Sequence, residues 1–109
     1  MTDQPVEAMI TRAIAGNEEA IATVLASAMD TTDARMVALA ALLASRADWI
    51  TRADRLALTT RDRQVVAISA SHLAGQHDLA QMLARDHLTD HPDSPIVEWI
   101  VCGLGHRRA

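Results

Sequence analysis

Apolar side chains recur three or four positions apart along the whole chain, and short polar segments interrupt them. The first run shows the spacing clearly, because Val6, Met9, Ile10 and Ala13 fall on one face of a helix. Six further runs have the same period. The sequence therefore predicts seven helices.

Residues that begin or end helices separate these runs. Gly16 and Gly75 suit the left-handed conformation that closes a helix. Asp48 is expected to cap the fourth helix, and Ser94 followed by Pro95 is expected to open the last one. The connections are short, so neighbouring helices must run antiparallel.

The pattern predicts an all-α fold in which residues 1–109 form one domain. The third helix is apolar on nearly every side, which indicates the buried centre of the domain. Weak self-similarity with a period of about 30 residues favours antiparallel helical hairpins stacked as a short solenoid. The expected units are hairpins at about 5–29, 33–58 and 61–90, followed by a C-terminal capping helix at about 95–104.

The amino-acid composition limits the possible fold classes and cellular compartments. Half of the residues are hydrophobic but only 2% are aromatic, which argues against a β-sandwich or β-barrel. The net charge of −4 argues against a nucleic-acid partner, and the longest apolar run, residues 36–44, is too short to cross a bilayer. The start of the chain lacks the basic and apolar segments of a secretory signal. We therefore expect a cytoplasmic protein with no nucleic-acid and no membrane partner.

Residues 61–94 carry a more specific pattern. Gly75 stands in a turn between two helices, the small residue Ala80 follows five positions later, and Leu88 and Pro92 close the segment. This order resembles the second half of a tetratricopeptide repeat, of the type found in the tetratricopeptide repeat protein 38 family, which bacteria and animals share. The resemblance implies a tetratricopeptide-like helical scaffold that binds a protein or peptide partner in a groove, and it implies no catalytic residues.

Two further features predict surfaces for a partner. Trp99 lies on a terminal helix with more apolar residues than one hairpin covers, so an exposed surplus would indicate a partner or homodimer surface and full coverage a simple capping helix. Four arginines flank the turn between the fourth and fifth helices. They predict either a clamp for an acidic peptide or a solvated surface paired with nearby aspartates. These arginines are Arg52, Arg55, Arg61 and Arg63.

Candidate chemistry is limited to histidines and one thiol. His87 and His91 stand one helical turn apart beside acidic residues, a spacing that can hold Zn²⁺ or Ni²⁺. The alternative is that His91 caps its helix while His87 is partly solvated. Cys102 is interpreted as a packed thiol, and His72 as a hydrogen-bonded substitute for a core aromatic residue. No nucleophile, phosphate-binding or paired-carboxylate motif occurs, so the sequence predicts no enzyme and no cofactor.

These observations predict a non-catalytic protein-protein interaction module that binds its partner through a helical groove or an Arg-rich surface. Two alternatives stay open. One is a dimeric structural subunit held by the terminal helix. The other is a small helical protein that responds to a metal ion or small ligand through a histidine-rich region, formed by His72, His77, His87 and His91.

Overall fold

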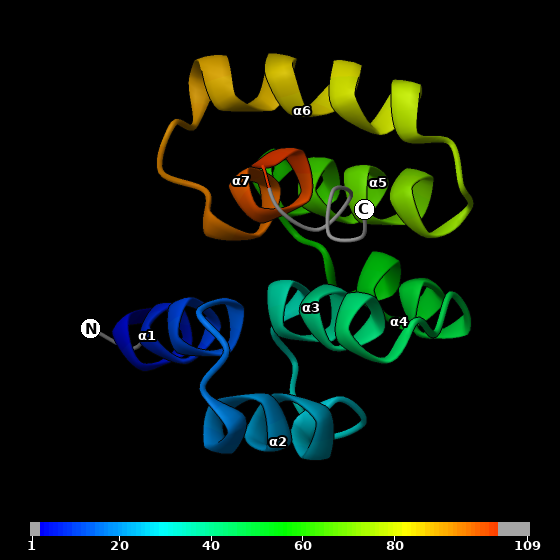
Figure 1. Ribbon diagram of the computed structural model, residues 1–109. Coiled ribbons are helices and arrows are strands. Elements are labelled where there is room, and N and C mark those ends of the chain that lie inside the picture. The colour runs from blue at the N-terminus through cyan, green and yellow to red at the C-terminus, as the bar shows by residue number, and fades with distance from the viewer. Residues whose placement is uncertain (1–2, 103–109) are drawn as a thin grey trace.

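The computed structural model describes residues 3–102, which form seven α-helices and no β-strand (Figure 1). The all-α prediction and the seven helices are thereby confirmed. The helices are α1 (Asp3–Ile14), α2 (Glu18–Ser27), α3 (Ala34–Ala44), α4 (Asp48–Leu56), α5 (Thr60–Leu73), α6 (His77–Asp90) and α7 (Pro95–Cys102). The last two positions of the predicted terminal helix, 103–104, lie outside the described residues.

The turns follow from the residues that occupy them. Gly16 and Gly75 have φ angles of +96° and +81°, as the sequence predicted for residues that close α1 and α5. The side chain of Asn17 caps α2 by accepting a hydrogen bond of 2.8 Å from the backbone N–H of Ala20. The prediction that Asp48 caps α4 is wrong: Asp48 is the first residue of that helix, where its negative charge still complements the helix dipole.

The central helix of the molecule is α3. Eight of its 11 residues are buried, which confirms the prediction from its apolar circumference. It contacts α1, α2, α4 and α5. Alanines at four of the buried positions let these neighbours approach closely, so a chain with only two aromatic residues still forms a continuous core.

The N-terminal and C-terminal helices meet. In Figure 1, α6 lies above α5 and α7, while α1, α3 and α4 form the middle of the molecule over α2. Besides α5 and α6, which precede it in the chain, α7 also contacts α1. Its Ile96, Val97 and Ile100 are buried in these contacts. None of the helices within residues 3–102 is long and apolar enough to cross a bilayer.

Candidate binding cleft

An open cleft of about 760 Å³ lies where the end of α5, the first half of α6 and the last turn of α7 meet. Its wall combines polar and apolar side chains. Its lining residues are His72 from α5, then His77, Asp78, Ala80, Gln81, Met82 and Arg85 from α6, and Ile100 and Val101 from α7. This mixture suits a ligand that is itself amphipathic.

The turn between α5 and α6 sets the position of two histidines in the cleft. The backbone N–H of Gly75 donates to the carbonyl oxygen of His72 at 3.0 Å, and the positive φ of this glycine reverses the chain at once into α6. The rings of His72 and His77 consequently meet edge to face, with their centroids 4.8 Å apart. Burial lowers the pKa of His72, and the neighbouring His77 lowers it further.

The cationic and flexible parts of the cleft come from α6. Arg85 is exposed, and no carboxylate of residues 6–102 lies within 4.0 Å of its guanidinium group. Met82, one turn earlier, is 55% exposed. An exposed methionine adapts its shape to an apolar group, while an unpaired guanidinium can bind a carboxylate with two hydrogen bonds.

The predicted metal ligands His87 and His91 lie near each other, with ring centroids 4.9 Å apart. However, both ring nitrogens of His87 already take part in hydrogen bonds. Only 1% of His87 is exposed. Its Nδ1 lies 2.7 Å from Oε1 of Gln64 and donates to it, because a carbonyl oxygen can only accept. Its Nε2 then accepts from the hydroxyl of Ser94 at 2.9 Å.

Both ring nitrogens of His87 would therefore have to give up a hydrogen bond before the imidazole could bind a metal ion. Burial lowers the pKa of His87, and His91 and Arg61 add to this effect, whereas Asp90 opposes it. Among the residues that the structure describes, no three His, Cys, Asp or Glu side chains form a group that could hold a metal ion. The sequence could not show that His87 forms these hydrogen bonds, because its partners come from α5 and from the turn before α7.

Two of the four predicted partner-binding arginines, Arg52 and Arg61, form hydrogen bonds within the protein. Arg52 is directed at the chain that follows α2, where its Nε and Nη2 donate to the carbonyl oxygens of Ala28 and Thr31 at 3.1 and 2.7 Å. Arg61 donates to the carbonyl oxygen of Asp93 at 2.6 Å. These two side chains join segments of the protein to one another.

The other two, Arg55 and Arg63, are exposed and available to a partner. The arginine that lines the cleft, Arg85, was not among the sequence candidates. The sequence of α6 does indicate that this helix has an exposed apolar surface. Leu79 and Met82 are apolar residues on the side of the helix away from Ala80 and Ala84. In the structure both Leu79 and Met82 are exposed.

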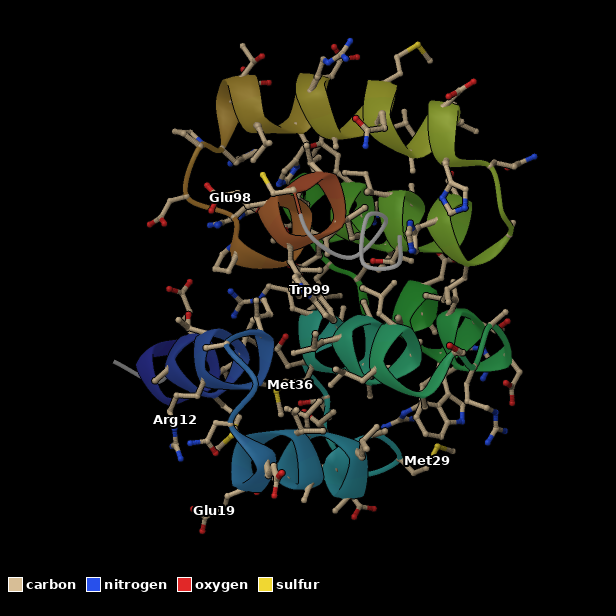
Figure 2. All side chains as sticks on the ribbon, viewed as in Figure 1. Arg12, Glu19, Met29, Met36, Glu98 and Trp99 are labelled. Atoms are coloured by element: carbon tan, nitrogen blue, oxygen red, sulfur yellow. The ribbon has the colours of Figure 1, made fainter. Side chains whose placement is uncertain are left out.

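The predicted role of Trp99 depended on how much of its side chain is exposed. Trp99 is half-buried and packs against the core, and Figure 2 shows it pointing from α7 toward the middle helices. It is not among the exposed large hydrophobic residues of the described chain, which are Met29, Leu58, Leu79 and Met82. The core thus covers much of Trp99, and a homodimer through α7 stays a prediction. Cys102, expected to be packed, is exposed at the end of α7.

Comparison of the chain with protein-family models, with curated proteins and with solved structures found no match.

Proposed function

We propose that the protein is a non-catalytic interaction module, and that the cleft between α5, α6 and α7 binds a peptide segment of a partner protein. The segment would carry a carboxylate group beside an apolar side chain. The observation that carries this proposal is the position of Arg85, an exposed guanidinium without a carboxylate partner among residues 6–102, on the wall of this open cleft.

The two halves of the cleft fit the two halves of such a ligand. The half-buried Val101 and the exposed Met82 offer an apolar surface, with the buried Ile100 behind it, from which a bound aliphatic side chain would displace water. Gln81 and Arg85 offer donors on the same helix, one turn apart. Asp78 is the one carboxylate of the lining, so basic peptides find a single partner there, whereas acidic peptides meet an arginine and two histidines.

The architecture that we propose for this module is a short tetratricopeptide-like solenoid of three hairpins with α7 as its cap. Contacts between α1 and α2, between α3 and α4, and between α5 and α6 support the three hairpins. The contacts of α3 with α2 and α5 support their stacking. Because α7 also lies against α1, the chain itself covers part of the inner helices, and we assign the ligand to the cleft beside α6.

The experiment that tests this proposal is selection of peptides from a random library displayed on phage, followed by affinity measurements on the selected peptides. We expect selection of sequences with Asp or Glu next to Leu, Ile or Met. The substitution Arg85→Gln should weaken their binding at least about tenfold, since a charge-assisted hydrogen bond contributes about 1.5–3 kcal/mol.

The matched control is Arg63→Gln, which removes an equally exposed arginine that does not line the cleft. It should leave the affinity unchanged. If Arg63→Gln abolishes binding while Arg85→Gln does not, the Arg-rich surface near Arg55 is the partner site and the cleft is not. Selection of peptides without acidic residues would contradict the assignment of a carboxylate ligand.

A further inference from the structure

The two histidine pairs of the molecule differ in one respect that matters for metal binding. The ring centroids are 4.8 Å apart in the pair His72 and His77, and 4.9 Å apart in the pair His87 and His91. In the second pair, His87 has both nitrogens in hydrogen bonds to Gln64 and Ser94. In the first pair, neither ring has a hydrogen bond to any of the described side chains or backbone groups 6–102.

We propose that His72 and His77 form a two-imidazole site for a borderline divalent transition-metal ion, of which Zn²⁺ is the probe we choose. Imidazole nitrogen is a preferred ligand of Zn²⁺ and Cu²⁺, and both rings open into the cleft, through which the ion can enter. The i, i+4 spacing in the sequence indicated the other pair. Because no hydrogen bond joins the rings of His72 and His77 to residues 6–102, we assign the site to this pair.

The geometry of the turn favours chelation by both rings. Two nitrogens that each bind Zn²⁺ at about 2.0–2.1 Å lie roughly 3.3 Å apart in a tetrahedral arrangement. The backbone hydrogen bonds from Gly75 and Gln76 back to the end of α5 hold the two histidines at contact distance before any ion arrives. His77 is exposed, so its ring can rotate toward the ion without unpacking the core.

The environment of His72 also suits a metal ligand. Imidazole binds metal ions only in its neutral form, and burial together with the neighbouring ring lowers the pKa of His72. Since no group of three ligands occurs among the described residues, the pair would supply two protein ligands and water would complete the coordination of the ion. We therefore expect moderate affinity and an exchangeable ion, in contrast to a closed structural zinc site.

The test is isothermal titration of Zn²⁺ into the protein without an affinity tag, in a Cys102→Ser background so that the exposed thiol does not contribute. The wild-type pair should bind one Zn²⁺ with the highest affinity in the protein. His72→Gln and His77→Gln should each weaken this binding at least about tenfold, because each leaves a single imidazole. Mg²⁺, which prefers oxygen ligands, should not bind.

The control is His91→Gln, which removes a histidine from the other pair and should leave the affinity for Zn²⁺ unchanged. Histidine side-chain NMR signals report directly on which rings meet the ion, so they separate loss of a ligand from loss of fold. The proposal is overturned if the protein takes up no Zn²⁺, if His91→Gln is the variant that loses it, or if either His72→Gln or His77→Gln binds as the wild type does. Zinc uptake needs no peptide, so its failure would leave the proposed peptide-binding function untouched.

Discussion

The substitution His87→Ala tests whether a buried polar cluster holds the end of α6 to the rest of the molecule. His87 and Ser94 are 1% and 3% exposed, and His87 joins Ser94 to Gln64 on α5. Removing the imidazole deletes two hydrogen bonds at once. It also leaves the buried Ser94 hydroxyl without its hydrogen-bond partner on His87.

The magnitude follows from these two effects. A buried hydroxyl left without its partner costs about 1–3 kcal/mol. Truncating a fully buried ring adds a cavity term, so we expect a total loss of about 2–4 kcal/mol in the free energy of unfolding. A domain of this size has about 5–15 kcal/mol in all, and the melting temperature should fall by at least about 8 °C.

The assay is urea unfolding followed by circular dichroism, with thermal melting as a second measurement. Thr89→Ala, at an exposed position on the same helix, is the control and should change the free energy by less than about 0.5 kcal/mol. A double-mutant cycle with Ser94→Ala should give a coupling energy of at least about 0.5 kcal/mol. A loss under about 1 kcal/mol for His87→Ala would refute the reasoning, because the ring would then not be the buried junction described.

Three further predictions follow from single residues. Burial lowers the pKa of His87 in the folded state below its ordinary value of 6.5, so the unfolded chain binds the proton first as the pH falls. The free energy of unfolding, measured by urea titration, should therefore decrease below about pH 6.5. This decrease should be smaller in His87→Gln. Arg52→Met should cost about 1–3 kcal/mol by orphaning two carbonyl oxygens after α2, whereas Arg55→Met, at an exposed position, should be nearly neutral in the same assay. Gly75→Ala should cost about 1–2 kcal/mol from its φ of +81° alone, since a Cβ there meets no atom within 4 Å; an unchanged melting temperature would contradict this.

Local features of the chain were predictable because their causes lie within a few residues. The helix of apolar residues around Val37 could be identified as the centre because nearly every side of it is apolar. Gly75 could be identified as a helix end because the left-handed conformation favours glycine. Asn17 was predictable as a cap on the same local grounds.

The roles of the long polar side chains were not predictable in this way. Arg52 and Arg55 are three positions apart and look alike in the sequence, yet the first bonds to carbonyl oxygens more than 20 residues earlier and the second faces solvent. His87 likewise finds Gln64, 23 residues away in the sequence. Such pairs depend on how helices cross, which the periodicity of one helix does not determine.

The buried polar cluster around His87 and the shape of the cleft both depend on the turn between α6 and α7. His87 holds Ser94, and Arg61 holds the carbonyl oxygen of Asp93, so these two contacts fix where the chain leaves α6 and where α7 begins. The direction of α7 from that point decides where Ile100 and Val101 stand opposite α6, and those two residues form one wall of the cleft. A folded His87 variant should therefore bind selected peptides more weakly although His87 does not line the cleft, and Thr89→Ala should not. Stability and binding would then be coupled through the position of one short helix.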